Sequence, residues 1–295
     1  MKRAFLVAGG AFAALVAYPA MAQEERDAPP PPPPADAPTV YDGDWISVGA
    51  GVGYGPSYEG SDDYVLFPAP LVMGQIGPVG ISPRAGGVAL DFIPSADGEV
   101  DFDFGVAARL RSNRASQIED AVVEAAGELD RAVEVGPTAG VSFPGVLNPY
   151  DSLSFTTDVK WDVAGAHKGM TISPGVAYFT PLSRGMAAAL SVSAEYGDDD
   201  YADYYYSVTP AQSAASATAG EGALPLYQAD GGFNKVGATL LLAYDLDGDL
   251  TNGGLSLVGI GGYSSMLGDA KRTPYTSVRG DADQWFAGLG IGYTF

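Results

Sequence analysis

The chain has 295 residues, with 15 Lys and Arg against 36 Asp and Glu, which gives a formal net charge of −21 at pH 7. A surface this acidic repels the phosphates of nucleic acids, so we expect no nucleic-acid partner. The sequence contains no cysteine, which excludes disulfides, cysteine nucleophiles and thiolate metal ligands.

The amino terminus has the layout of a secretory signal peptide. Basic residues at positions 2 and 3 precede an apolar run over residues 4–17, and small residues follow up to Ala22. We therefore predict a signal peptide over residues 1–22, with cleavage after Ala22. A membrane anchor is the less favoured interpretation, because the apolar run is short and the residues after it are rich in proline.

The next segment, residues 23–44, has the sequence QEERDAPPPPPPADAPTVYDGD, which is acidic and rich in proline. Such a composition favours an extended, semi-rigid segment without a hydrophobic core. We therefore predict a periplasmic linker. The run of six prolines leaves a second interpretation open, in which the segment is a docking ligand for a partner.

Alternating apolar and polar residues follow the linker. In the segment VDFDFGVAARLR, residues 100–111, Phe102 and Phe104 fall on one face, and Asp103 and Arg111 fall on the other. Side chains of a strand alternate between its faces, and a strand that crosses a membrane needs roughly 9–11 residues. A soluble β-sandwich also alternates, but its strands are shorter. We therefore predict an all-β fold, a single antiparallel transmembrane barrel over residues 45–295.

The pattern predicts twelve strands, and an even number leaves both mature termini in the periplasm. The count depends on a hairpin at Gly86 and Gly87, without which it would be eleven. The long connections 112–132, 198–232 and 267–283 all fall at one end, as expected for outer loops opposite short periplasmic turns. The strands are predicted near residues 45–55, 64–75, 79–85, 88–94, 100–111, 133–143, 152–163, 170–180, 186–197, 233–246, 254–266 and 284–295.

The last segment, DQWFAGLGIGYTF, ends on an aromatic residue. Trp285, Leu289, Tyr293 and Phe295 share one face, while glycines occupy much of the other. We predict that this is the closing strand, with Phe295 facing lipid in an aromatic girdle at the periplasmic interface. Tyr293 and Phe295 are also the expected signal for the outer-membrane assembly machinery.

Two acidic stretches, YEGSDDY and EYGDDDYADYYY, are candidate cation-contact loops, because hard divalent cations bind several carboxylate oxygens. Neither has the ligand spacing of a calcium loop, so we predict no metal ion and no cofactor. The alternative is a solvated rim of acids, bridged by cations to lipopolysaccharide. The candidate residues are Tyr58, Glu59, Gly60, Ser61, Asp62, Asp63, Asp198, Asp199, Asp200 and Asp203.

The connection 198–232 is a candidate cation-attracting lid. It holds six acidic residues and neither Lys nor Arg, so its field attracts cations. Tyr201 and Tyr204 to Tyr206 would add cation–π contacts if they are exposed. The alternative is a solvated rim whose acids only help solubility and lipopolysaccharide contacts.

Charged residues on the inward faces of the predicted strands carry both signs. They either line a pore or pair across the lumen and close it, and the sequence favours neither interpretation. The single histidine, His167, lies between two predicted strands with no marked serine partner, so we interpret it as a solvated loop residue. The inward charges are Asp101, Asp103, Arg109, Arg111, Asp158, Lys160, Asp162 and Lys235.

Short motifs spread over residues 45–295 resemble those of the outer-membrane family that includes the MltA-interacting protein and OmpV. The stretch ATAGEGA (217–223) departs from the pattern and looks inserted. The motifs are YEGSDDY (58–64), FPAPLV (67–72), SVTPAQSAAS (207–216), LYQADGGF (226–233), YSSMLGDAKRTP (263–274) and GLGIGYTF (288–295). The resemblance implies a scaffold that holds a murein lytic transglycosylase near a murein synthase, and it brings no catalytic residues.

These features together predict a non-enzymatic barrel in the outer membrane of a Gram-negative bacterium, acting as a scaffold or envelope-interaction protein. The alternative is a channel or binding protein for small cationic solutes, including antibiotics. The expected partners are outer-membrane lipid and lipopolysaccharide, the outer-membrane assembly machinery and murein-processing enzymes of the periplasm.

Overall fold

A computed structural model describes residues 39–94 and 100–295. The predicted signal peptide, residues 1–22, and most of the predicted linker, residues 23–44, lie outside the described residues.

The last residues of the predicted linker are described, and they contact the barrel. Thr39 caps a short 3₁₀ helix, η1 (Val40–Asp42), in a capping box with the Asp42 carboxylate. The Val40 N–H donates to the Thr251 carbonyl at 2.8 Å. The chain therefore turns and attaches to the wall before the first strand begins.

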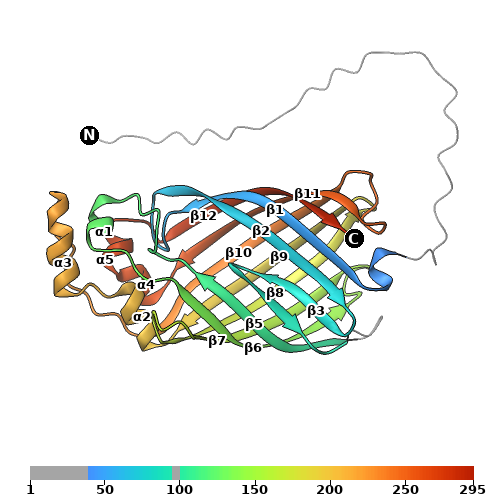
Figure 1. Ribbon diagram of the computed structural model, residues 1–295, viewed down its shortest axis with the longest axis horizontal. Coiled ribbons are helices and arrows are strands. Elements are labelled where there is room, and N and C mark those ends of the chain that lie inside the picture. Colours follow the sequence, from blue (N-terminus) through green and yellow to red (C-terminus); the bar gives the residue numbers. More distant parts are fainter. Residues whose placement is uncertain (1–38, 95–99) are drawn as a thin grey trace, which may run out of the picture. The chain divides into compact units, whose positions relative to one another are not determined.

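The described residues form one closed barrel of twelve antiparallel strands, which confirms the predicted fold (Figure 1). Neighbours in the chain are neighbours in the wall, and the last strand pairs with the first, with Ser47 opposite Thr294 and Tyr54 opposite Ala287. The strands are β1 (Trp45–Pro56), β2 (Tyr64–Ile76), β3 (Val79–Arg84), β4 (Gly87–Asp91), β5 (Asp101–Arg111), β6 (Ala132–Pro144), β7 (Ser152–Asp162), β8 (Met170–Ser183), β9 (Met186–Gly197), β10 (Gly232–Asp245), β11 (Gly254–Met266) and β12 (Asp283–Thr294).

The hairpin on which the strand count depends is present. β3 and β4 pair from Gly80 opposite Asp91 to Arg84 opposite Gly87. Gly86 makes the turn with φ +72°, a left-handed conformation that glycine adopts without steric cost. Twelve strands, rather than eleven, therefore close the barrel.

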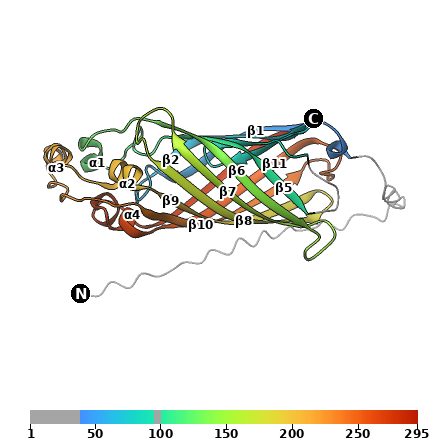
Figure 2. The ribbon, with the colours of Figure 1, turned by 90° about the horizontal axis from the view of Figure 1, so that it is seen from below.

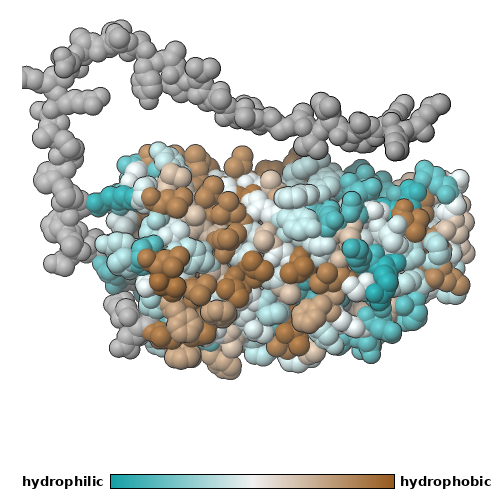
Figure 3. Space-filling view, turned by 180° about the vertical axis from the view of Figure 1, so that it is seen from behind, coloured by the Kyte–Doolittle hydropathy of each residue, from teal (hydrophilic) through white to brown (hydrophobic). Residues whose placement is uncertain are grey.

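The outer surface of the wall is apolar, as the alternation predicted. On β5, Phe102 and Phe104 are 59% and 58% exposed, whereas the inward Ala107 is fully buried. Apolar residues spread over the strands in Figure 3, while hydrophilic residues gather at one end of the barrel. A polar lumen inside an apolar belt is the arrangement of a barrel that spans a membrane.

Phe295 directly follows the closing strand β12 and lies on the outer surface, as predicted. The Phe295 N–H donates to the Ile46 carbonyl at 2.9 Å, which adds one bond between the two ends of the wall. Its side chain is 63% exposed, and its ring lies 4.6 Å from that of Tyr293 between centroids. An assembly role for these two residues stays a prediction.

Short helices gather at one end of the barrel, here called the helical end (Figures 1 and 2). They all lie in the three long connections, which share this end as predicted. Among the described residues, no helix has both the length and the apolar character needed to cross a membrane. The helices are α1 (Ala121–Ala125), α2 (Asp199–Tyr206), α3 (Pro210–Ser216), η2 (Ala217–Ala219), α4 (Gly268–Arg272) and α5 (Pro274–Ser277).

Two small hydrophobic clusters hold these helices together as a cap. One joins the first strand connection to α1, α5 and the segment after α3, and the other is built around the tyrosines of α2. The first contains Tyr58, Ile118, Val122, Val123, Ala126, Val208, Leu224 and Tyr275, and the second contains Tyr201, Ala202, Tyr205, Tyr206, Ala229, Met266 and Ala270.

Candidate functional site

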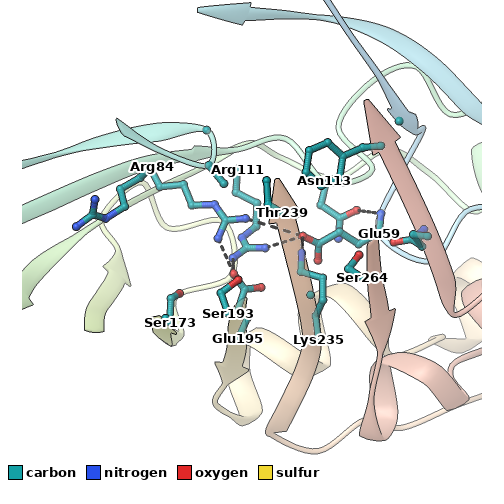
Figure 4. Close-up of a pocket in the computed structure, with 18 of the residues that line it drawn as sticks. Glu59, Arg84, Arg111, Asn113, Ser173, Ser193, Glu195, Lys235, Thr239 and Ser264 are labelled. Carbon is teal, nitrogen blue, oxygen red and sulfur yellow. Dashed lines mark hydrogen bonds and ion pairs between the residues drawn. The ribbon is translucent and has the colours of Figure 1, made fainter. Parts of the chain in front are cut away.

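The barrel encloses a cavity of about 570 Å³ in the half that adjoins the helical end. Charged side chains from several strands point into it and toward one another (Figure 4). The cavity is the candidate functional site, because it is concave and brings charged groups from distant parts of the chain together.

Arg111, near the end of β5, is the centre of the cavity's ion pairs. Its Nε donates to Glu134 at 2.6 Å, its Nη1 to Glu59 at 3.1 Å and its Nη2 to Glu195 at 2.8 Å. The side chain is only 2% exposed, and its guanidinium lies over the Tyr201 ring, 4.9 Å from the centroid. One arginine therefore joins carboxylates from β6, β9 and the connection after β1.

Two more cations and a phenol also belong to this group. Arg109 donates to Glu195 at 2.5 Å, and the Lys235 ammonium donates to Glu59 at 2.9 Å. Tyr206 donates its hydroxyl to Glu59 at 3.3 Å. Burial alone would raise the pKa of Glu59, but the positive charges of Lys235 and Arg111 outweigh it and hold this pKa below its usual range.

His167 belongs to this group, and its prediction as a solvated loop residue was wrong. Its side chain is completely buried, with Nε2 3.3 Å from the Glu134 carboxylate. Its Nδ1 accepts the Gly169 N–H at 3.1 Å, and its ring meets that of Tyr201 edge-on at 5.2 Å. The imidazole is enclosed because α2 covers the short connection that carries it.

A second group of charges lies on the other side of the cavity. Asp158 accepts from Arg84 at 3.2 Å, from Lys160 at 3.1 Å and from the Thr138 hydroxyl at 2.7 Å. In Figure 4 the Arg84 side chain points away from the Arg111 group. One carboxylate here serves two cations, and the Asp103 carboxylate is also within electrostatic range of Arg84.

These contacts bear on five of the eight inward charges predicted from the sequence. Arg109, Arg111, Asp158, Lys160 and Lys235 each take part in an ion pair. Among the described residues, Asp101, Asp103 and Asp162 take part in none, so the choice between pairing and a pore is not decided. Hydroxyl groups of Ser173, Ser193, Thr239 and Ser264 line the remaining space. At the helical end, the cap of helices lies over the Arg111 group.

The predicted stretch YEGSDDY separates into residues with different surroundings. Glu59 lies in the cavity, whereas Tyr58 is buried in the cap and donates its hydroxyl to the Tyr275 carbonyl at 3.1 Å. Gly60, with φ +100°, and Ser61 attach the connection to the segment before β12, where Ser61 bridges Gly280. Asp62 and Asp63 are exposed to solvent.

The acids of the second predicted stretch mainly hold α2 in place. Asp198 is its N-cap and accepts the Tyr201 N–H at 3.0 Å and the Met170 N–H at 2.8 Å. Asp199 accepts the Gly231 N–H at 2.8 Å, Asp203 accepts from Gln228 at 2.8 Å, and Asp200 is exposed.

The prediction that tyrosines of the connection 198–232 are exposed and contact external cations was wrong. Tyr201, Tyr205 and Tyr206 are at most 2% exposed and face the lumen, where burial raises their pKa values. The cation over the Tyr201 ring is Arg111 of the same chain. Within residues 39–94 and 100–295, no three His, Cys, Asp or Glu side chains gather in a way that could hold a metal ion.

Sequence reasoning missed the roles of Glu134 and Arg84. Glu134 is fully buried and faces inward on β6, on the same face of the strand as Thr138. The alternation on that strand was a sufficient signal to place it in the lumen. Nothing local to Arg84 indicated that it would reach Asp158, 74 residues away.

A closed antiparallel barrel with an apolar outer belt and a charged, enclosed lumen defines a membrane-spanning β-barrel protein. The sequence over residues 48–295 matches the profile of the family described as MltA-interacting protein MipA, and the chain belongs to this family. It is therefore an outer-membrane β-barrel protein. Among curated proteins, none has a sequence that matches this chain.

Three solved outer-membrane proteins are similar in architecture. An outer-membrane channel from Pseudomonas putida F1 is 14% identical, with a TM-score of 0.42, and the match covers 89% of this chain and 99% of that one. The Pseudomonas putida toluene transporter TodX is 10% identical, with a TM-score of 0.35 and coverages of 86% and 89%. Pseudomonas aeruginosa OprD is 13% identical, with a TM-score of 0.28 and coverages of 88% and 96%. Similarity at this level carries no argument about function.

Proposed function

We propose that this protein is a non-enzymatic scaffold of the outer membrane that binds murein-processing enzymes on its periplasmic side. Membership of a family described by its interaction with MltA supports a docking role. The observation that carries the proposal is the ion-paired group of side chains under the helical cap. Arg111, at 2% exposure, joins three carboxylates beneath a helical cap, an arrangement suited to a rigid wall more than to an open pore.

The geometry of the only histidine in the sequence supports a role without catalysis. His167 is enclosed by tyrosine rings and the Glu134 carboxylate, and its Nδ1 is engaged by a backbone N–H. A hydrolase of the serine type needs an imidazole in contact with a serine hydroxyl and with substrate. The contacts of His167 are those of a group that orders the cap.

The orientation follows from the same proposal. The helical end, with its long connections, faces outward toward lipopolysaccharide, and the short turns and the segment before β1 face the periplasm. Residues 39–44, the described end of the predicted linker, then lie at the periplasmic rim, where a murein enzyme is within reach. The outer-membrane assembly machinery is the remaining partner, through Tyr293 and Phe295.

Cross-linked co-purification tests the proposal. Envelopes from cells with the full chain and with residues 23–44 deleted are cross-linked, and proteins bound to the barrel are identified by mass spectrometry. Murein-processing enzymes are expected with the full chain and depleted with the deletion, while heat-modifiability shows that both barrels fold. The absence of such enzymes from both samples would contradict the scaffold function.

A second candidate function is a channel or binding protein for small solutes, and the cavity itself favours it. The sequence suggested cationic solutes, but the lining argues for anionic ones, because five of its side chains are basic and three are acidic. These are Arg84, Arg109, Arg111, Lys160 and Lys235 against Glu59, Asp158 and Glu195. Conductance in planar bilayers separates the candidates: a scaffold is silent, and a channel conducts with anions preferred.

A further inference from the structure

The wall of the barrel is interrupted between β2 and β3. These strands pair through only three residue pairs, from Gly74 opposite Ile81 to Ile76 opposite Val79. β2 continues for ten further residues, Tyr64–Met73, which pair with β1 on the other side but not with β3. We call the unpaired stretch along Tyr64–Met73 the β2 seam.

Prolines lie on both sides of the β2 seam. Pro68 and Pro70 are in β2, and Pro83 is in the part of β3 that has no partner in β2. Proline has no N–H to donate to a ladder, so within sheets it is largely confined to edges. The seam is therefore encoded in the sequence as an unpaired edge, and a neighbouring strand cannot close it with a regular ladder.

The seam leaves backbone carbonyls without ladder partners. The Leu66 carbonyl lies 3.5 Å from the Gln117 amide nitrogen of the connection after β5. Alternate residues of a strand direct their backbone groups to the same side, so Pro68 and Pro70 face the same way as Leu66. Ten residues cover about 33 Å along a strand, so the seam extends well into an apolar belt about 25 Å tall.

A backbone edge at that depth needs water or a polar ligand beside it, because lipid offers no hydrogen bonds. The charged cavity is adjacent to it. The cavity lining includes Phe67 on one side of the seam and Arg84, Ala85 and Gly86 on the other. The interior of the barrel therefore reaches the interruption in its wall.

Arg84 is the charged group at this place. Its side chain is 25% exposed, whereas the side chain of Asp158, its partner, is 6% exposed and also binds Lys160. Apolar and proline side chains flank it across the seam, with Leu66 63% and Phe67 37% exposed. A partly exposed cation thus stands between the cavity and an apolar outer edge.

We propose that the β2 seam is a lateral entrance to the cavity, and that it takes an amphiphile with an anionic headgroup and an apolar chain. The headgroup binds Arg84 inside the wall, and the chain lies in the seam beside Phe67 and Pro68. This inference does not depend on the scaffold function. An added β-strand from a protein partner is the poorer occupant, because Pro68 and Pro70 cannot donate to it.

Cysteine labelling tests the entrance directly, because the sequence has no cysteine of its own. Pro68→Cys places a thiol on the outer face of β2 at the edge of the seam, and Leu240→Cys places one on the outer face of β10, which is paired on both sides. In proteoliposomes, a charged, membrane-impermeant maleimide should label the seam thiol at least about tenfold faster. Equal rates at the two positions would overturn the lateral entrance.

Equilibrium binding tests the ligand class. Delipidated barrel in nonionic detergent should bind radiolabelled hexadecanoate saturably, and Arg84→Gln should weaken this binding about tenfold, with hexadecanol unaffected. Arg84→Lys keeps the charge and should stay within about threefold of wild type. Arg184→Gln, which removes an exposed arginine paired with Asp249 in a turn, is the matched control and should change nothing.

The source of the amphiphile is distinguished by extracting the purified, untreated barrel. An anionic phospholipid retained by wild type and lost from Arg84→Gln assigns the bilayer as the source. Binding of hexadecanoate without a retained lipid assigns a free amphiphile. Hexadecanoate binding and lipid retention that are both unchanged in Arg84→Gln would overturn the proposal, provided that heat-modifiability shows the variant to be folded.

Discussion

Replacing Arg111 with methionine removes the centre of the lumenal ion pairs and keeps most of the side-chain volume. Arg111 makes three bonds to carboxylates at 2.6, 2.8 and 3.1 Å and is 2% exposed. In Arg111→Met, the carboxylates of Glu59, Glu134 and Glu195 keep only Arg109 and Lys235 as nearby strong cations. One buried negative charge is then left uncompensated.

The expected loss in the free energy of unfolding is about 3–5 kcal/mol at pH 7, the range for breaking a buried ion pair from one side. Three separate charge-assisted bonds at about 1.5–3 kcal/mol each would sum to more. Arg109 and Lys235 move toward the freed carboxylates and recover part of that sum, so we expect the lower range.

The stability that the ion pairs of Glu59 contribute should depend on pH. The pKa of Glu59 is lowered in the folded barrel, so its stabilisation is present above the ordinary carboxylate pKa and is lost as the pH falls through the folded value. Wild type should therefore lose stability below about pH 4.3. Arg111→Met has already lost the part of this stabilisation that Arg111 supplies, while Lys235 still supplies the rest, so the difference between the two proteins should shrink on going from pH 7 to pH 4.

Urea unfolding of the barrel in lipid vesicles, followed by tryptophan fluorescence, measures both quantities. Arg184→Met is the matched control, because Arg184 is 48% exposed and its pair with Asp249 should contribute at most about 1 kcal/mol. If Arg111→Met unfolds like the control at pH 7, or if its deficit is the same at pH 4, the ion-pair reasoning is refuted.

Three further changes test other parts of the structure. Phe295→Asp should lower the amount of heat-modifiable barrel in outer membranes, and wild-type amounts would contradict the role of this residue in closing and assembly. Val159→Arg should cost about 2–4 kcal/mol of stability if Val159 faces the lipid midplane. Asp158 faces inward, so Asp158→Asn should not impair insertion, although it leaves Arg84 and Lys160 without their shared carboxylate. Equal insertion defects in the two variants would show that the register of β7 is wrong. Asp198→Ala should cost about 1 kcal/mol through loss of the α2 cap and expose the cap to protease, and unchanged proteolysis would contradict that role.

The sequence by itself determined the barrel. A strand in a membrane wall has lipid on one face and a polar lumen on the other, so the period of two is imposed at every strand and is visible without tertiary information. The predicted ends of all twelve strands lie within three residues of the observed ends. The hairpin at Gly86 and the outward row that ends at Phe295 were predicted for the same reason.

The face of a residue, by contrast, does not determine its partner. Alternation placed Arg111 and Lys235 in the lumen, but Glu59, which both contact, is 52 and 176 residues away and lies outside any strand. Which charges meet across a barrel depends on strand tilt and on how the connections fold over its end. The question of pairing or pore therefore had no answer in the sequence.

The cap was also a tertiary result. The segment EYGDDDYADYYY contains both the N-cap Asp198 and the tyrosines that α2 buries, yet the same sequence is also compatible with an exposed acidic loop. Short helices are marginal on their own, and packing on the lumenal charges decides which face is buried. His167 is buried for the same reason. Pro68 and Pro70 are a signal of the β2 seam in the sequence itself. Only the tertiary structure shows that β3 diverges from β2 and so leaves these residues without a pairing partner.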